Sequence, residues 1–140
     1  MHSWKDDRIF QRACVGLARR GHAVTLIALK DSPNEPDSLV SMGVNTILLP
    51  TMHGIDQRWY GSSLVVEKAL TVDADVYQFH DPDILPHILK LKKRRNKSVI
   101  VYDIHENYVS RIRDWGLPKL IGDLFRMYEK KIIRKIDGIT

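Results

Sequence analysis

The sequence predicts an α/β fold, a Rossmann-like parallel sheet with helices on both faces. Short runs of apolar, β-branched residues alternate along the chain with longer segments whose apolar residues recur every three or four positions. The short runs are nearly continuous in their hydrophobicity, which is typical of strands covered on both faces. Strands that alternate with helices are joined by crossovers, so the sheet is expected to be parallel.

Each element has a local signal. The first helix has an aspartate, Asp6 or Asp7, at the position of an N-cap, and Gly21 as its stop. Residues 51–61 have the composition of a loop. In chain order we expect a helix over 6–21, a strand over 23–29, a short helix over 38–43, a strand over 44–49, a helix over 62–74, a strand over 75–79, a helix within 82–95, a strand over 99–104, a helix over 117–137 and the first residues of a further strand.

The last of these helices is amphipathic. Its apolar residues share one side and most of its charged residues lie opposite, the pattern of a surface helix. The apolar side carries Leu117, Leu120, Ile121, Leu124, Met127 and Tyr128, and the polar side carries Lys119, Asp123, Arg126, Lys130 and Arg134.

The composition excludes several protein classes. With 140 residues, 44% hydrophobic and 28% charged, the chain has the make-up of a globular domain with its own core. It has no apolar run of about 20 residues and no signal peptide at its start, so we expect a cytoplasmic protein. The single cysteine, Cys14, allows no internal disulfide and is expected to be a buried, inert thiol.

The formal charge of +5 is concentrated in two segments, "KLKKRRNK" (90–97) and "RMYEKKIIRKID" (126–137). Such clusters attract nucleic acid or anionic lipid, and they also occur as solvated helix ends that complement the helix dipole. A basic membrane-binding or nucleic-acid-binding module is therefore one alternative function. Aromatic residues are not interleaved with the cations as in stacking platforms, so no nucleic acid partner is expected.

Two strands end in the same kind of polar sequence, "HDPD" after residue 79 and "HENY" after residue 104. Because parallel strands point the same way, His80 with Asp81 and His105 with Glu106 are expected to face one crevice, where open α/β sheets bind ligands. Imidazole moves protons or hydrogen-bonds sugar hydroxyls near neutral pH. The three remaining internal histidines have no such placement and are expected to be structural or solvated: His22, His53 and His87.

The polar residues after the first of these strands have a second interpretation. Asp81 followed by Pro82 fits an N-cap and a first helical position, so Asp81 could serve only to start a helix. Pro86 removes a backbone hydrogen bond in the next turn, which moves the expected start of the helix toward Leu85. Capping and ligand binding both stay open for Asp81.

A metal-dependent hydrolase is the alternative enzyme. Its ligands would be His80, Asp81, His105 and Glu106, whose side chains suit zinc or manganese. The sequence has no His-x-His or HExxH spacing that would fix the geometry of such a site, so no metal is expected.

Three segments resemble a known family: "DDRIFQRACVGLARRGHAVTLIA", "ADVYQFHDPDILPHILKL" and "VIVYDIHENY". They are similar to the N-terminal half of GT-B fold glycosyltransferases of the large group-1 family, which build bacterial capsule, O-antigen and exopolysaccharide. The similarity runs in order through nearly all 140 residues. It implies transfer of a sugar from a nucleotide-sugar donor to a hydroxyl, with retained anomeric configuration and without a cofactor.

The resemblance assigns roles to individual residues. His105 matches the histidine near the reacting sugar carbon and is the candidate catalytic residue. The "HDP" loop of His80, Asp81 and Pro82 matches a loop on the acceptor side of the cleft, and the "DxRI" loop of the family matches Asp7, Arg8 and Ile9, with His2 before it. The candidate substrate-binding residues are His80, Asp81, Asp83, Glu106, Asn107, Asp7 and Arg8.

The resemblance also implies that parts of the enzyme are missing. The family's first strand would precede His2, and the second domain, which holds most of the nucleotide-sugar donor, would follow residue 140. Residues 1–140 are thus expected to be a single partial domain, inactive alone, with a gap in its sheet. The expected acceptor is a sugar or a lipid-linked sugar, with a peripheral contact to the inner membrane.

Overall fold

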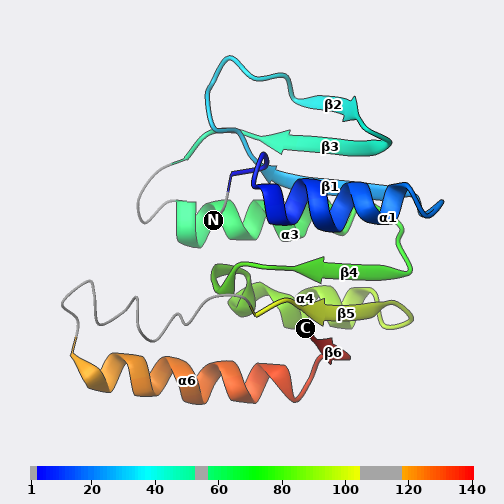
Figure 1. The fold of residues 1–140 in the computed structure, drawn as a ribbon. Helices are drawn as coiled ribbons and strands as arrows, with labels where there is room; N and C mark the ends of the chain where they lie inside the picture. The colour runs from blue at the N-terminus through cyan, green and yellow to red at the C-terminus, as the bar shows by residue number, and fades with distance from the viewer. Residues whose placement is uncertain (1–2, 53–56, 105–117) are drawn as a thin grey trace. The chain divides into compact units, whose positions relative to one another are not determined.

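The computed structural model describes residues 3–52, 57–104 and 118–140. The chain divides into two compact units, Met1–Ala69 and Leu70–Thr140. Each unit has its own three-stranded sheet with helices beside it (Figure 1). The predicted α/β class, with parallel strands and helices, is confirmed.

The first unit begins with a continuous helical segment made of η1 (Asp7–Val15) and α1 (Gly16–Ala18). Asp6 is its N-cap, because one oxygen of its carboxylate accepts hydrogen bonds from the backbone N–H groups of Arg8 and Ile9 at 3.0 and 3.1 Å. Gly21 follows the helix with φ of +89°, a conformation that glycine adopts without strain. The predicted cap and stop are both confirmed.

A small hydrophobic core forms where this helix packs on the sheet. Ile9, Phe10, Cys14 and Val15 are buried together with Val44. Burial raises the pKa of the Cys14 thiol, since the thiolate is poorly solvated there. The prediction of a buried thiol is confirmed.

The sheet of the first unit has the order β1–β3–β2, formed by β1 (Val24–Leu29), β2 (Ser38–Ser41) and β3 (Val44–Leu49). Strands β1 and β3 are parallel over their full length, as predicted. The short helix expected over 38–43 is wrong, because β2 pairs antiparallel with β3 as one arm of a hairpin.

The turn of this hairpin explains the error. Met42 and Gly43 have φ of 51° and 80°, so both residues of the two-residue loop lie in the left-handed region. Such a turn has the twist that joins two adjacent antiparallel strands. Methionine rarely adopts this conformation, so Gly43 is the only residue of the loop whose type indicates a turn.

The first unit ends in a helical stretch of η2 (Gln57–Gly61) and α3 (Ser62–Ala69). Residues 57–61 were expected to be loop, but they extend the predicted helix at its N-terminal side. The buried face of α3 carries Val65 and Val66, and the helix contacts β1 (Figure 1).

The sheet of the second unit has the order β4–β5–β6, formed by β4 (Val76–Phe79), β5 (Val99–Tyr102) and β6 (Gly138–Ile139). All of its pairings are parallel, which confirms the predicted parallel arrangement of β4 and β5. The two-residue strand β6 lies where a further strand was expected.

Two helical elements connect β4 to β5. A short helix, η3 (Pro82–Ile84), leads into α4 (Leu85–Arg94). The regular helix begins at Leu85 as expected, because Pro86 in its first turn has no N–H to place in the helical hydrogen-bond pattern. Leu85, Ile88 and Ile100 are fully buried and form the centre of this unit.

Helix α6 (Lys119–Ile133) is shorter at both ends than the expected range 117–137. It buries Gly122 and Ile132, whereas the residues of the predicted apolar side that lie within the helix, Leu120 to Tyr128, are exposed. The turn after the helix is fixed by Asp137, whose carboxylate accepts hydrogen bonds from Lys92 Nζ at 2.6 Å and from the backbone N–H of Ile100 at 2.8 Å.

Within the described residues, β1 pairs with a strand on one side only and so does β4. Their partners are β3 and β5. The expected gap in the middle of one sheet stays a prediction, since these strands belong to separate units.

Candidate functional site

The candidate site is built at the carboxyl ends of β4 and β5. The last residues of the two strands, Phe79 and Tyr102, are partners in the parallel register. Their rings stack with centroids 4.5 Å apart and an angle of 7° between their planes, and the backbone N–H of Asp103 donates to the carbonyl of Phe79 at 2.9 Å. This rigid end places the next residues of both strands, His80 and Asp103, next to each other.

A histidine–aspartate pair results. The distance between His80 Nδ1 and Asp103 Oδ2 is 2.9 Å, and the two side chains are 14% and 9% exposed. When the neutral imidazole donates its Nδ1–H to the carboxylate, the lone pair that accepts protons lies on Nε2. The pair is therefore suited to hold a hydroxyl group and to take up its proton.

Asp81 and Asp83 follow His80 in the loop after β4, and their negative charges act on Tyr102 at the end of β5. Asp81 occupies the N-cap position of η3 in an extended conformation, but its side chain makes no capping hydrogen bond. Its backbone carbonyl alone accepts from the N–H of Ile84, at 3.1 Å. The structure thus does not support the interpretation that the Asp81 carboxylate serves only as a cap.

The electrostatics of Tyr102 show that these acids gather around the strand end. Burial first, then Glu129, and then the negative charges of Asp81 and Asp83 raise the pKa of the Tyr102 phenol far above its ordinary value. Tyr102 Oη donates a hydrogen bond to Glu129 Oε1 at 3.2 Å, which links β5 to α6. Burial raises the pKa of Glu129, while the hydrogen bond from Tyr102 opposes this shift.

The remaining predicted site residues are placed elsewhere or not described. His105, the catalytic candidate, lies outside the described residues together with Glu106 and Asn107. The same holds for His2 and His53. In the described part of the chain, no group of three histidine, cysteine or acidic side chains could hold a metal ion.

Asp7 and Arg8 lie at the start of η1 in the first unit. The Asp7 carboxylate is 3.5 Å from Arg12 Nε, and both side chains are largely exposed. Of the predicted site residues, His80, Asp81 and Asp83 lie in the loop after β4 and the start of η3, and the structure does not place Asp7 and Arg8 relative to them.

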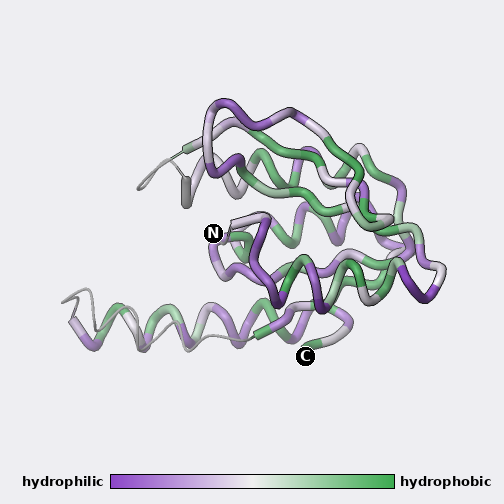
Figure 2. Tube along the Cα trace, turned by 45° about the horizontal axis from the view of Figure 1, so that its top comes forward, coloured by the Kyte–Doolittle hydropathy of each residue, from purple (hydrophilic) through white to green (hydrophobic). Residues whose placement is uncertain are grey.

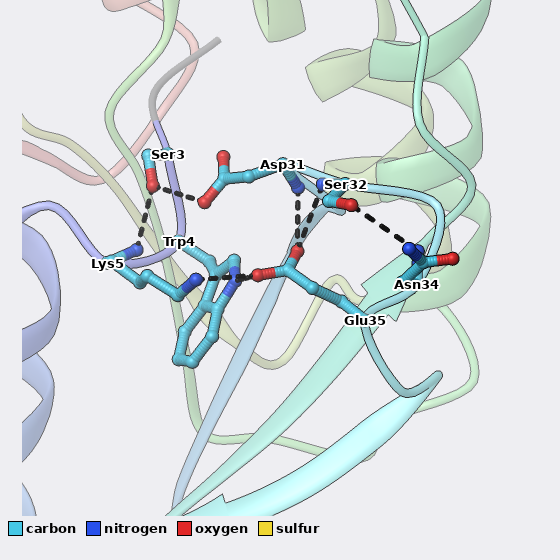
Figure 3. A network of polar contacts seen from close by, with 7 residues as sticks. All are labelled: Ser3, Trp4, Lys5, Asp31, Ser32, Asn34 and Glu35. Atoms are coloured by element: carbon cyan, nitrogen blue, oxygen red, sulfur yellow. Dashed lines mark hydrogen bonds and ion pairs between the residues drawn. The ribbon is translucent and has the colours of Figure 1, made fainter.

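The segment just before Asp7 and Arg8 is fixed by a second polar cluster, shown in Figure 3. The Glu35 carboxylate accepts hydrogen bonds from Trp4 Nε1 at 3.0 Å, from Lys5 Nζ at 2.7 Å and from the backbone N–H of Asp31 at 2.7 Å. These donors, with Lys5 first, lower the pKa of Glu35 from its ordinary value of 4.5 to about 2. The cluster joins the loop after β1 to the approach of η1.

The family model described as Glycosyltransferase Family 4 matches residues 8–140. The chain belongs to glycosyltransferase family 4. The match extends over both units and over the candidate site, so His80 and Asp103 lie in a glycosyltransferase domain of Rossmann-like GT-B fold. No curated protein and no solved structure matches the chain.

Sequence reasoning did not find Asp103 in this glycosyltransferase domain. The strand was expected to run to residue 104, which placed the polar end at His105, but β5 ends at Tyr102. The parallel register offered a usable signal, because it pairs Phe79 with Tyr102 and makes the next residues, His80 and Asp103, neighbours. Glu35 was also missed, because its partners Trp4 and Lys5 lie about 30 residues away in the sequence.

Proposed function

We propose that this chain is the acceptor-side half of a retaining GT-B glycosyltransferase. The complete enzyme transfers a sugar from a nucleotide-sugar donor to a hydroxyl of a sugar or lipid-linked acceptor, in the synthesis of a bacterial surface polysaccharide or glycolipid. Membership of glycosyltransferase family 4 supports glycosyl transfer. The resemblance of the three sequence segments to enzymes of bacterial polysaccharide synthesis supports the finer assignment.

The observation that carries the proposal is the contact between His80 Nδ1 and Asp103 Oδ2 at the end of β4 and β5. An acceptor hydroxyl must be held in a fixed position while its oxygen attacks, and it must lose its proton as the new bond forms. The imidazole, oriented by a buried carboxylate, accepts a hydrogen bond from that hydroxyl through Nε2. His105, by resemblance, acts beside the reacting sugar carbon.

The charge of the site favours an acceptor over a donor. His80 contacts the carboxylate of Asp103, and the loop that begins with His80 carries the carboxylates of Asp81 and Asp83. Carboxylates accept hydrogen bonds from sugar hydroxyls, but they repel the diphosphate of a nucleotide sugar. The donor is therefore held mostly by a C-terminal domain, which supplies the positive charge that this loop lacks.

The proposed enzyme works in the cytoplasm without a cofactor or metal and with a peripheral contact to the inner membrane. Its basic segments, 90–97 and 126–137, support a contact with anionic lipid headgroups.

The proposal is tested by product formation. The enzyme with its donor-binding half should be incubated with a panel of nucleotide sugars and with sugar or lipid-linked acceptors, and glycosylated products should be detected by mass spectrometry. NMR of the product should show the anomeric configuration of the donor. Hydrolysis of the donor without transfer to any acceptor, or an inverted product, would overturn the assignment as a retaining transferase.

Acceptor binding is tested separately on the 140-residue chain. Saturation-transfer NMR should detect acceptor sugars bound to the wild type, with weaker signals for Asp81→Asn. Asp73→Asn is the matched control, because Asp73 is an exposed acid of the same unit whose partner is Arg95. Equal signals for both variants would argue against Asp81 as an acceptor residue.

A further inference from the structure

Helix α6 exposes a continuous row of large apolar side chains, which we name the α6 stripe. It consists of Leu120, Ile121, Leu124, Met127 and Tyr128. The exposed fractions range from 39% for Tyr128 to 69% for Met127. The spacing i, i+1, i+4, i+7, i+8 places all five on one side of the helix, with the buried Gly122 on the opposite side and the buried Ile132 at the edge of the row. An exposed apolar row of this length usually marks an interaction surface.

The outward orientation of the stripe is fixed by contacts on the other side of the helix. Glu129 accepts the hydrogen bond from Tyr102 Oη on β5, and Asp137, beyond the C-terminal end, binds Lys92 of α4. Both contacts resist rotation of α6 about its axis. Burying the stripe against its own unit would break them, so the stripe is a stable feature of the surface.

Cations lie along one side of the stripe and follow it at its C-terminal end. All six basic residues of α6 and the turn that follows it are exposed: Lys119, Arg126, Lys130, Lys131, Arg134 and Lys135. The same segment contains three acids, Asp123, Glu129 and Asp137, of which Glu129 contacts Tyr102 and Asp137 contacts Lys92. Figure 2 shows the resulting alternation of apolar and polar residues along the helix.

We propose that α6 lies in the headgroup layer of an anionic membrane, with the α6 stripe inserted among the acyl chains and the neighbouring cations bound to lipid phosphates. Among the described residues no helix is long and apolar enough to cross a bilayer. A helix with an apolar row and basic borders binds instead in the plane of the interface. Each Lys or Arg near an anionic surface adds to the attraction, which salt weakens.

Charge complementarity decides against two other occupants of this surface, a second copy of the chain and nucleic acid. A second copy docked through the stripe would bring two sets of six cations together, and like charges at an interface oppose association. Nucleic acid would engage the cations, but the aliphatic side chains of Leu120, Leu124 and Met127 offer no surface for base stacking. An anionic bilayer satisfies both the apolar row and the cations.

The inference deepens the peripheral membrane contact of the proposed function and rests on it. Tyr102, which contacts Glu129 of α6, directly precedes Asp103 of the candidate site. Docking through α6 therefore holds the end of β5 close to the lipid surface, where a lipid-linked acceptor presents its sugar. Membrane binding is measured without substrate, so its failure would leave the glycosyltransferase assignment unaffected.

The test is co-flotation of the 140-residue chain with vesicles of phosphatidylcholine alone or with about one-third phosphatidylglycerol. We expect binding to the anionic vesicles only, and a decrease when the salt is raised from about 0.1 to 0.5 M. The double variant Leu124→Glu, Met127→Glu should lower the partition coefficient by about tenfold or more, because two inserted side chains become charged. Circular dichroism checks that the variant is folded.

Two matched controls define the surface. Val40→Glu adds a charge at an apolar residue of β2 that is even more exposed than Leu124 and Met127, and it should leave binding unchanged. Lys131→Glu should weaken binding more than Lys93→Glu, which makes the same change in the other basic segment, on α4. The proposal would be overturned if the chain did not bind anionic vesicles, or if the stripe variant and Val40→Glu lost the same amount of binding. It would also be overturned if the stripe variant dissociated an oligomer of the chain without changing its flotation.

Discussion

His80 and Asp103 follow adjacent parallel strands at the same register position and meet through a contact of 2.9 Å between Nδ1 and Oδ2. The contact joins residues 23 positions apart, so the sheet and not the local sequence creates it. A nearly buried carboxylate that accepts from one ring nitrogen determines which nitrogen can accept a proton from a ligand. Asp103 is thus a positioning residue for His80.

The first prediction concerns this positioning. In the complete enzyme, Asp103→Asn should lower kcat/KM for the acceptor by at least about tenfold, because an amide does not hold the imidazole in the same tautomer as a carboxylate does. Nitrogen NMR of the His80 ring in the 140-residue chain should show the proton on Nδ1 in the wild type and on Nε2 in the variant.

Asp73→Asn is the control, since it makes the same change at an exposed aspartate of the second unit. It should alter neither the tautomer nor the rate. A variant at position 103 with a wild-type tautomer and wild-type kinetics would remove Asp103 from the site.

The second prediction separates His105 from Asp81. His105→Ala in the complete enzyme should reduce turnover by about 10²- to 10⁴-fold with little change in acceptor binding, because a group beside the reacting carbon acts on the transition state. Asp81→Ala should mainly raise the KM for the acceptor, since its carboxylate makes no capping hydrogen bond that its loss would break. Steady-state kinetics, with thermal melts as a check of folding, decide. Near wild-type turnover with a raised KM in His105→Ala would assign that histidine to binding.

The elements that the sequence predicted best are the strands with continuous apolar runs. Strands β1, β3 and β4 were located to within one residue, because their β-branched residues are bounded by polar or turn-forming residues. Strand β2 was missed because its four residues carry no such run and its turn uses Met42, which gives no turn signal. Local sequence thus predicts a strand where β-branched and aromatic residues form a short run between polar or turn-forming residues.

The sequence predicted the site residue that is placed by the end of a single strand. It did not predict the residue that is placed by the pairing of two strands. His80 follows the apolar run of β4 directly and was found from that position alone. Asp103 can be recognised as a site residue only from the register of β4 and β5, which makes it a neighbour of His80. The outward orientation of α6 was also unpredictable, because it depends on the contact between Glu129 and Tyr102 and not on the amphipathic pattern.

The third prediction concerns the turn between β2 and β3. Met42→Asn should stabilise the protein by about 0.5 to 1 kcal/mol, because asparagine tolerates a positive φ better than methionine does. Gly43→Ala should destabilise it by about 1 kcal/mol, since φ of +80° strains any residue with a Cβ atom. Urea unfolding of both variants measures the two effects. If the changes have the same sign, the turn does not have the conformation described.

The fourth prediction is a pH dependence that comes from Glu35. Its pKa is lowered from 4.5 to about 2, first by the hydrogen bond from Lys5 and then by that from Trp4. The folded state therefore binds this proton less readily than the unfolded state, and the carboxylate stabilises the fold above pH 4.5. This stabilisation is lost as the pH falls from about 5 toward 2. The wild-type Tm should fall more steeply over this range than the Tm of Glu35→Gln, with Asp123→Asn on the exposed surface of α6 as the control.

A direct measurement checks the same prediction at the level of the single group. Carbon NMR of the Glu35 carboxyl should give a titration midpoint near 2, and Lys5→Met should move it upward because the main donor is gone. The shift should be larger than the one caused by Ser32→Ala, because the bond from the backbone N–H of Ser32, at 3.4 Å, is long and does not depend on its side chain. A midpoint near 4.5 in the wild type would mean that Glu35 does not hold the segment of Trp4 and Lys5 against the loop after β1.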